Sequence, residues 1–502
     1  MNKLEQKIKE YSLLRQKIKA FYYVNYMISW DSETEAPIGC FEERSKQVGV
    51  LSEMLSKLML SKKNVKLMRE LYEAKDQLPE LLRVEIIKEY KNINKKLLVP
   101  TKEMTKYEML LASSGNVWTN AKINNDYSLF KDTLKQIIDF NMKYVDYVKT
   151  DQLQGYDVLL DEYEDGATQA FYDKFFSELR KEIVPLVQKI KAKGYNYNTE
   201  FIKNKYDITK QKEFASYLMD VMCFDKTRGL IKESEHPFTS GFGTTDVRIT
   251  NHYYEDLLTS SIFSVIHEAG HGTYELQCDS ALDDTLIGGG STMAMHESQS
   301  RFYENIIGRS SAFWETHYHT LQKLYPKELR DVTLNDFYHY VNIVDTTLIR
   351  TEADELTYPL HIMVRYEIEK MIFNKEITVD ELPQKWNELY KEYLGIDVPN
   401  DAQGILQDIH WAGGSFGYFP TYALGSAYAA QIYYAMKKDL DIDEAIKEGT
   451  LQKINEWLKE KVHRFGASKT PKEILVYATG EEFNPKYYVK YLKEKYAKIY
   501  DL

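Results

Sequence analysis

The chain has 502 residues, of which 43% are hydrophobic and 28% are charged. This composition is near the average of globular proteins, so it supplies enough apolar surface for a buried core and excludes a disordered chain. Lysine, aspartate and glutamate are mixed along the whole length and give a net charge of -11, which argues against nucleic acid as a partner.

The N-terminus shows no export signal. Residues 1–16, MNKLEQKIKEYSLLRQ, alternate apolar and charged side chains where a signal peptide has an unbroken apolar stretch. No run approaches the roughly 18 apolar residues of a membrane-spanning helix. The three cysteines, Cys40, Cys223 and Cys278, are far apart and fit a reducing compartment, where free cysteine packs as a small hydrophobe. We therefore expect a cytoplasmic protein with no membrane partner.

Helical spacing of apolar residues begins at the N-terminus and returns along the chain. Apolar residues three and four apart from Leu4 to Phe21 predict a first helix. The same spacing predicts helices over residues 48–60, 80–107, 130–148, 171–190, 440–463 and 485–500. Only 12 prolines and 24 glycines interrupt the chain, as expected for long helices. Length alone leaves the number of domains open, and because no repeat or obvious linker divides the chain, we expect a single all-α domain over residues 1–502.

Three glycine-rich stretches interrupt the helical pattern. Residues 235–250 contain a loop followed by Val247 and Ile249, which alternate as in a short strand. Residues 286–292 hold three consecutive glycines, and residues 411–425 place glycines and a proline among aromatic residues. Loops of this kind allow a ligand to approach the backbone closely. We therefore expect at most a small β element near residues 245–250, and active-site segments within residues 236–425.

The segment SIFSVIHEAGHGTYEL, residues 261–276, carries the pattern His-Glu-x-x-His. Residues four apart lie on one face of a helix, so His267 and His271 can bind one metal ion. Glu268 can then accept a proton from a water that the metal activates. A chance match is expected on the order of once in fifty such sequences. The preceding apolar run favours a buried helix, and two buried histidines need a partner such as a metal ion. The motif predicts hydrolysis without a covalent intermediate.

A catalytic zinc needs a third protein ligand and an open position. Glu275 lies eight residues beyond His267, a rise of about 12 Å along the helix, so it cannot complete the site. The helical stretch 293–308 offers Glu297 and Glu304 on one face. Either side chain could instead be solvated or paired, Glu297 with Arg301 for example, so spacing alone leaves the third ligand open.

Several further motifs, spread over nearly the whole chain, resemble the carboxypeptidase Taq family of metallocarboxypeptidases. They are His236-Pro237-Phe238, Asp246-Val247-Arg248-Ile249-Thr250, His267-Glu268-Ala269-Gly270-His271, His296-Glu297-Ser298-Gln299, Ile349-Arg350-Thr351-Glu352-Ala353-Asp354 and the segment from Gly404 to Trp411, with Trp30-Asp31 and Gly417-Tyr418-Phe419-Pro420. The resemblance implies a prolate, mostly helical body with a long central groove, and Glu297 as the third metal ligand. It also implies a homodimer that removes single C-terminal residues of many kinds from peptides.

A carboxypeptidase must recognise the free carboxylate at the end of its substrate. An arginine fork suits this geometry, and Arg350 and Arg248 both lie in the resembling motifs. Each could instead pair with a neighbouring carboxylate. For Arg350 we favour the role of carboxylate anchor over that of an ion pair. For Arg248 both roles stay open.

Two histidines and two tyrosines complete the predicted substrate site. A single histidine is more often structural, but the resemblance favours substrate contact for His236 and His410. A tyrosine hydroxyl can stabilise an oxyanion, and Tyr418 and Tyr422 lie in the aromatic stretch 411–425. With 40 tyrosines in the chain, the choice between tyrosines stays open.

Alternatives to a zinc carboxypeptidase remain at the level of sequence. A helical zinc endo-oligopeptidase would share the motif but cut internal bonds. A non-catalytic scaffold could keep a metal for stability, although a closed structural site has no use for Glu268. We expect one divalent ion per subunit, with zinc as the default, while cobalt or manganese can occupy the same ligands.

Overall fold

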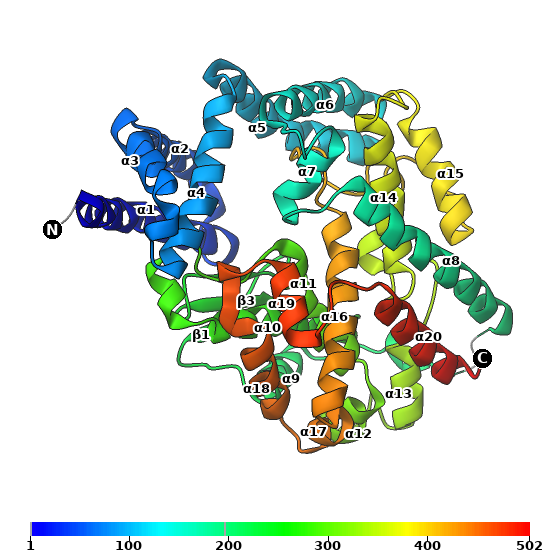
Figure 1. Cartoon of the computed structure of the whole chain (residues 1–502). Coiled ribbons are helices and arrows are strands. Elements are labelled where there is room, and N and C mark those ends of the chain that lie inside the picture. Colours follow the sequence, from blue (N-terminus) through cyan, green and yellow to red (C-terminus); the bar gives the residue numbers. More distant parts are fainter. Residues whose placement is uncertain (1–2, 195–196) are drawn as a thin grey trace.

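The computed structural model describes residues 3–194 and 197–502. Helices dominate this part of the chain (Figure 1), as predicted. The first half holds α1 Lys3–Thr34, α2 Phe41–Met59, α3 Lys62–Glu73, α4 Glu80–Leu98, α5 Thr101–Asn124, α6 Ser128–Val148, α7 Tyr156–Tyr163, α8 Gln169–Lys193 and α9 Ile208–Val221. The remainder holds α10 Leu258–Gln277, α11 Met293–Arg301, α12 Ser311–Leu324, α13 Leu334–Tyr340, α14 Tyr358–Phe373, α15 Leu382–Leu394, α16 Pro420–Asp439, α17 Ile442–Lys447, α18 Gln452–Lys461, α19 Pro471–Thr479 and α20 Lys486–Tyr500.

Two of the predicted helices are interrupted, and the prediction of a continuous helix was wrong for each. The segment 80–107 divides into α4 and α5 at Pro100, because proline disfavours helical backbone at the residue before it, and Val99 is extended. The segment 440–463 divides into α17 and α18, and Gly449 between them has a positive φ of 88°.

The other predicted helices are confirmed, three of them with ends within three residues of the prediction. The first helix continues to Thr34, 13 residues past Phe21. The second helix, α2, begins at Phe41, seven residues before the predicted start.

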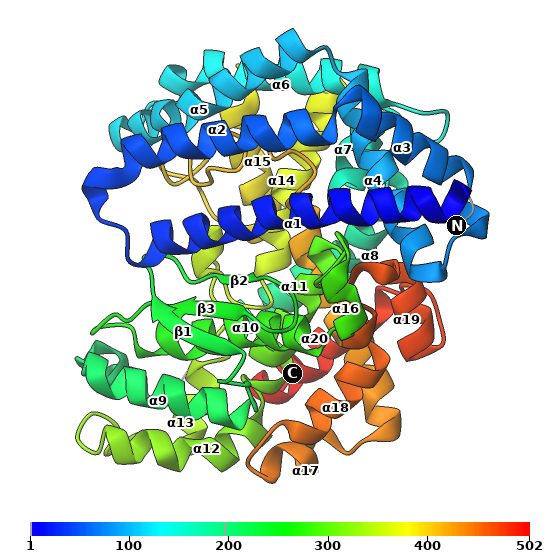
Figure 2. The same ribbon diagram turned by 90° about the vertical axis from the view of Figure 1, so that its left-hand side faces the viewer.

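A small mixed sheet is the β element of the described chain. Its strands are β1 Gly229–Glu233, β2 Thr239–Gly241 and β3 Val247–Asn251, with β3 in the centre, parallel to β1 and antiparallel to β2. Val247 and Ile249 are fully buried, which confirms the strand predicted from their alternation. The sheet lies against α10 (Figure 2), so its strands can place side chains beside the metal-binding motif.

Two hydrophobic clusters form the core of the described residues. The larger runs from Val99 to Tyr500 and includes α10, α11, α14 and α16. A smaller one joins α1, α3 and α4, and Figure 2 shows α1 and α2 running side by side across one side of the molecule. The single-domain organisation stays a prediction. Among the described residues, no helix combines the length and hydropathy needed to cross a membrane.

Candidate active site

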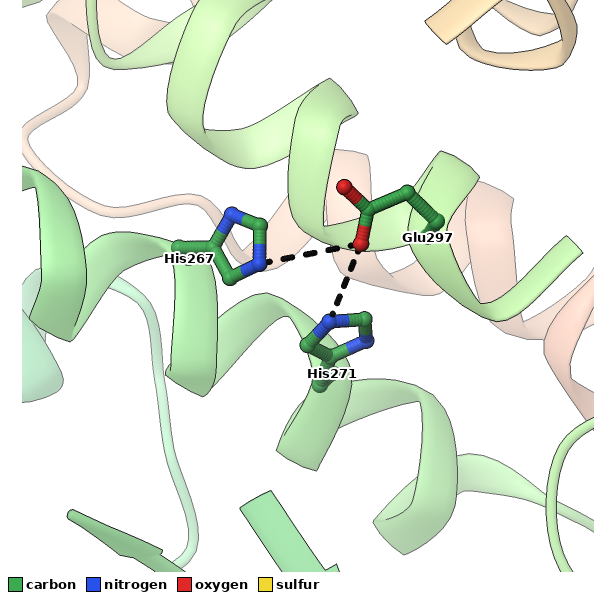
Figure 3. Close-up of side chains that lie close together, drawn as sticks. All are labelled: His267, His271 and Glu297. Carbon is green, nitrogen blue, oxygen red and sulfur yellow. Dashed lines mark ion pairs between the residues drawn. The ribbon is translucent and has the colours of Figure 1, made fainter. Parts of the chain in front are cut away.

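The His-Glu-x-x-His motif lies on the central helix α10, and its two histidines meet a carboxylate from α11 (Figure 3). Glu297 Oε2 lies 3.7 Å from His267 Nε2 and 3.5 Å from His271 Nε2. Three ligands of a tetrahedral zinc, each about 2.1 Å from the ion, lie roughly 3.4 Å apart. These three residues therefore fit a divalent metal ion, and they are the group of metal-ligating side chains that the described residues bring together.

The other ring nitrogen of each histidine also has a partner. His267 Nδ1 lies 2.9 Å from Glu304 Oε2, and His271 Nδ1 lies 2.6 Å from His296 Nδ1. Glu304 is on the π-helix η5, Phe302–Ile307, which continues α11. Spacing left Glu297 and Glu304 open as the third ligand. In the structure Glu297 joins the metal-binding group, and Glu304 contacts the other ring nitrogen of His267, where it can orient the ring.

The charge states of His271 and Glu297 suit metal binding. The pKa of His267, in contrast, is raised because the carboxylates of Glu297 and Glu304 outweigh burial, so a bound metal ion would compete with a proton there. Burial lowers the pKa of His271 to about 3, so the ring is neutral at physiological pH. Burial alone would raise the pKa of Glu297, but the charge of Arg301 together with the two neighbouring histidines outweighs burial and keeps this pKa well below its ordinary value. Arg301 Nε donates to Glu297 Oε1 at 2.7 Å, the pairing expected four residues apart. Neutral imidazole and ionised carboxylate are the forms that bind metal.

Glu268 is held beside the histidines by the sheet. The hydroxyl of Thr239, on β2, lies 2.6 Å from Glu268 Oε2 and 3.0 Å from the Glu268 carbonyl oxygen. Burial raises the pKa of Glu268 above its ordinary value. A carboxylate whose pKa is raised toward neutrality is a better proton acceptor at the pH of the cell.

Arg350 lies in a buried network. Its Nε and NH2 groups donate to Asp408 Oδ1 at 3.0 and 2.9 Å, and NH1 donates to the Tyr358 hydroxyl at 2.9 Å. Asp408 also pairs with Arg365, whose Nε lies 2.7 Å from Asp408 Oδ2. The alternative role of Arg350, an ion pair with a carboxylate, is therefore present in the structure and occupies part of its guanidinium. The anchoring role of Arg350 stays a prediction.

The aromatic segment predicted to bind substrate surrounds Arg350. Tyr422 lies with its ring centre 5.2 Å from the Arg350 guanidinium carbon and 5.2 Å from the Tyr418 ring centre. His410 Nε2 is 3.5 Å from the Tyr422 hydroxyl, and burial lowers the pKa of His410 to about 4. Four of the predicted substrate residues, Arg350, His410, Tyr418 and Tyr422, thus share one cluster. The stretch 411–425 is not all loop, because α16 begins at Pro420.

Tyr358 joins this cluster to the metal-binding group. The Arg301 guanidinium carbon lies 4.7 Å from the centre of the Tyr358 ring, and the Tyr358 hydroxyl accepts from Arg350. The negative charge of Glu297 contributes to the raised pKa of Tyr418 and of Tyr422, although burial is the larger cause. Arg301 and Tyr358 thus connect the metal-binding group and the Arg350 cluster through direct contacts.

The remaining predicted residues lie outside this cluster. Arg248, on β3, makes a bidentate ion pair with Asp246 at 2.8 Å for each bond. Its guanidinium also lies over the rings of Tyr26 and Trp30 on α1. His236 is exposed in the loop before β2. Their substrate-binding roles stay predictions.

A cavity of about 820 Å³ opens beside the metal-binding group, with His267 and Glu268 in its wall. Tyr340 and residues between Val341 and Asp354 also line it. His271, Glu297 and Arg350 are not among its lining residues, so the long groove that the resemblance implies stays a prediction. A peptide of a few residues fits a space of this size.

Sequence analysis missed several residues of the site. Thr239 and Tyr358 contact predicted residues but were not singled out in the sequence. Asp408, which pairs with Arg350, stood in the quoted segment from Gly404 to Trp411, and Glu275 was considered only as a metal ligand. His296 stood in a quoted motif, and Glu304 in the helical pair, so a signal existed for both.

A helical body, a His-Glu-x-x-His helix and a glutamate from the following helix define a metallopeptidase. The sequence pattern of the family described as carboxypeptidase Taq (M32) metallopeptidase matches residues 8–496, and the chain belongs to this family. It is 42% identical to carboxypeptidase 1 of Bacillus subtilis strain 168 over 495 residues, which covers 98% of each chain. It is 37% identical to thermostable carboxypeptidase 1 of Pyrococcus furiosus, over 97% of this chain and 98% of the relative.

A solved structure agrees with this assignment. The M32 carboxypeptidase of Deinococcus radiodurans R1 superposes with a TM-score of 0.95 at 30% identity, over 99% of this chain and 100% of the other. The chain is therefore an M32 metallocarboxypeptidase, and the hypothesis of a non-catalytic scaffold is not supported.

Proposed function

We propose that the protein removes single C-terminal residues from peptides with broad side-chain preference, with Glu268 as the general base. The observation that carries this proposal is the link from the metal-binding group through Arg301 and Tyr358 to Arg350. This link supports a role for Arg350 as a cationic anchor close to the bond that is cut. A site of this kind can select a chain end.

When bound, the metal ion supplies Lewis-acid activation of water and of the scissile carbonyl. Glu268 accepts the proton of the attacking water and later donates it to the leaving amine. Thr239 holds the Glu268 carboxylate in place through the 2.6 Å hydrogen bond to Oε2. Tyr422 or Tyr418 donates a hydrogen bond to the oxyanion that forms on the carbonyl.

Arg350 keeps donors for a substrate. A guanidinium carries five N–H groups, and the bonds to Asp408 and Tyr358 use one each on Nε, NH2 and NH1. One N–H on each terminal nitrogen therefore remains for the terminal carboxylate of a peptide. Asp408 orients the fork, and the neutral ring of His410 lies at its side.

We propose zinc as the ion, with cobalt or manganese as alternatives, because two imidazoles and a carboxylate suit all three. We also propose a cytoplasmic homodimer, as the family resemblance implies. The oligomeric state can be measured by light scattering of the purified protein.

One comparison tests the anchor. Peptides with a free C-terminus and their C-terminal amides are incubated with the zinc-loaded enzyme, and the products are separated and weighed by mass spectrometry. We expect stepwise release of single residues from the free acids and at least a tenfold lower rate on the amides. Equal cleavage of both forms, or internal fragments, would instead identify an endo-oligopeptidase.

A further inference from the structure

Behind the metal ligand His271 lies a chain of two further side chains. His271 Nδ1 is 2.6 Å from His296 Nδ1, and His296 Nε2 is 2.6 Å from Glu275 Oε1. Glu275 is on α10, one turn beyond His271, and His296 is on α11 beside the ligand Glu297. The contacts therefore extend from the metal ligand His271 through His296 to Glu275.

The positions of the protons in this chain follow from one requirement. A metal bound at His271 Nε2 takes the lone pair of that nitrogen, so the proton of a neutral ring is on Nδ1. This N–H can only donate to His296 Nδ1, which then accepts. The proton of His296 is therefore on Nε2 and donates to Glu275 Oε1. Glu275 can only accept, because it is ionised next to these donors, and it fixes the tautomers of both rings.

Glu275 is itself held in place. Its Oε1 also accepts from the backbone N–H of Gly290 at 2.9 Å. A side chain at Gly290 would put its Cβ 2.6 Å from His296 Cδ2 and 2.7 Å from Tyr274 Cε1. The three consecutive glycines noticed in the sequence thus allow the backbone to pack directly against the histidine ring.

The second histidine is supported in a different way. His267 Nδ1 contacts the carboxylate of Glu304 directly, and Glu304 also pairs with Arg301 and Arg309. Direct contact with a carboxylate is common for metal-binding histidines. At His271 a second imidazole stands between ligand and carboxylate.

We propose that His296 and Glu275 are positioning residues that orient His271 and set its tautomer for metal binding. This inference rests on the metal site proposed above. Partners of this kind usually change metal affinity by about 10- to 100-fold.

The test measures zinc affinity rather than activity. The dissociation constant of Zn²⁺ is determined by competition with a chromophoric chelator for the wild type, E275L, H296F and the double variant. We expect E275L and H296F each to bind zinc about 10- to 100-fold more weakly, and the double variant no more weakly than H296F, because Glu275 acts through His296. E275Q keeps an acceptor oxygen, so it should recover most of the loss.

Two controls separate this effect from loss of folding. E355L removes a buried carboxylate that pairs with Lys495 at 2.6 Å and makes no hydrogen bond to His267, His271 or Glu297, so it should leave zinc affinity within about twofold of wild type. The visible spectrum of the Co²⁺-loaded protein should change in H296F and not in E355L. Zinc affinity of E275L equal to that of E355L, or losses that multiply in the double variant, would overturn the proposal.

H271Q distinguishes this inference from the site assignment. If H271Q binds zinc as tightly as the wild type, the metal site itself is misplaced and both proposals fail. If H271Q loses zinc while E275L and H296F keep it, the metal site stands and the positioning role is wrong.

Discussion

Arg350 and Asp408 form a buried ion pair in which both Nε and NH2 of the arginine donate to one oxygen, Asp408 Oδ1, at 3.0 and 2.9 Å. Arg365 occupies the other oxygen of the same carboxylate. The aspartate therefore lies between two cations, and its negative charge is more than balanced. Such an arrangement leaves net positive charge where the substrate carboxylate is expected.

Replacement of Arg350 tests this arrangement. R350K keeps the charge but loses the planar fork, so we expect kcat/KM for a free-acid dipeptide to fall about 10- to 100-fold, the loss of one charge-assisted hydrogen bond. The rate on the amide of the same peptide should stay at its low wild-type value. R83K, on the surface, is the matched control. An R350K enzyme with wild-type kcat/KM would remove Arg350 from the anchor.

Replacement of Glu268 tests the general base. E268Q keeps the shape and the contact with Thr239 but cannot accept a proton from water, so we expect kcat to fall by about 10²- to 10⁴-fold. The zinc content of the purified variant should equal that of the wild type, because Glu268 is not among the three ligands. Retention of activity in E268Q would exclude the proposed mechanism.

Gly425 on α16 controls the space around the third ligand. A Cβ there would lie 2.8 Å from both Cβ and Cγ of Glu297 and 3.0 Å from the Ala294 carbonyl oxygen. We expect G425A to displace Glu297, with a tenfold or larger loss of zinc affinity and a loss of about 1–3 kcal/mol in the free energy of unfolding. Chelator competition and urea unfolding measure the two quantities.

Gly49 on α2 provides the matched substitution, because a Cβ there meets nothing within 4 Å. G49A should keep wild-type zinc affinity and gain up to about 1 kcal/mol from helix propensity. Similar zinc affinities for G425A and G49A would contradict the role given to Gly425.

Metal removal should lower stability as well as activity. Zinc binds the folded site and not the dispersed ligands of the unfolded chain, so about a thousandfold excess over the dissociation constant adds roughly 4 kcal/mol. A chelator should therefore lower the unfolding temperature, and zinc should restore it. H267Q, which lacks one ligand, should show little response to either. A response of wild-type size in H267Q would contradict the ligand set.

The buried histidine His317 should make the folded protein less stable in acid. Burial lowers the pKa of this histidine on α12 from 6.5 to about 4, so below pH 6.5 the unfolded chain takes up a proton before the folded one. Stability should therefore fall between pH 6.5 and 4, by up to about 3 kcal/mol from this residue. Urea unfolding of the metal-free protein measures the slope, since acid also releases bound metal.

Two variants isolate that contribution. H317F should show a flatter dependence over the same range, although it also loses the contact of His317 Nδ1 with the Tyr217 hydroxyl at 2.7 Å. H319N, an exposed residue on the same helix, should keep the wild-type slope. Equal slopes for all three proteins would assign the acid sensitivity to other groups.

Local spacing was enough to predict the helical character and the reaction. His267, Glu268 and His271 are within one turn of one helix, so their geometry follows from the periodicity of that helix alone. Val247 and Ile249 were recognised in the same way from strand alternation. The interruption at Pro100 was also visible in principle, because proline acts on its nearest neighbours.

Tertiary structure decided the roles that depend on distant segments. Glu297 and Glu304 have the same spacing signal, and only the approach of α11 to α10 makes one a metal ligand and the other a support for His267. Sequence reasoning rightly excluded Glu275 as a ligand, since a helix carries it too far from His267. In the folded protein Glu275 nevertheless contacts the site through His296. Side chains far apart in sequence, such as these two, come together only when helices pack.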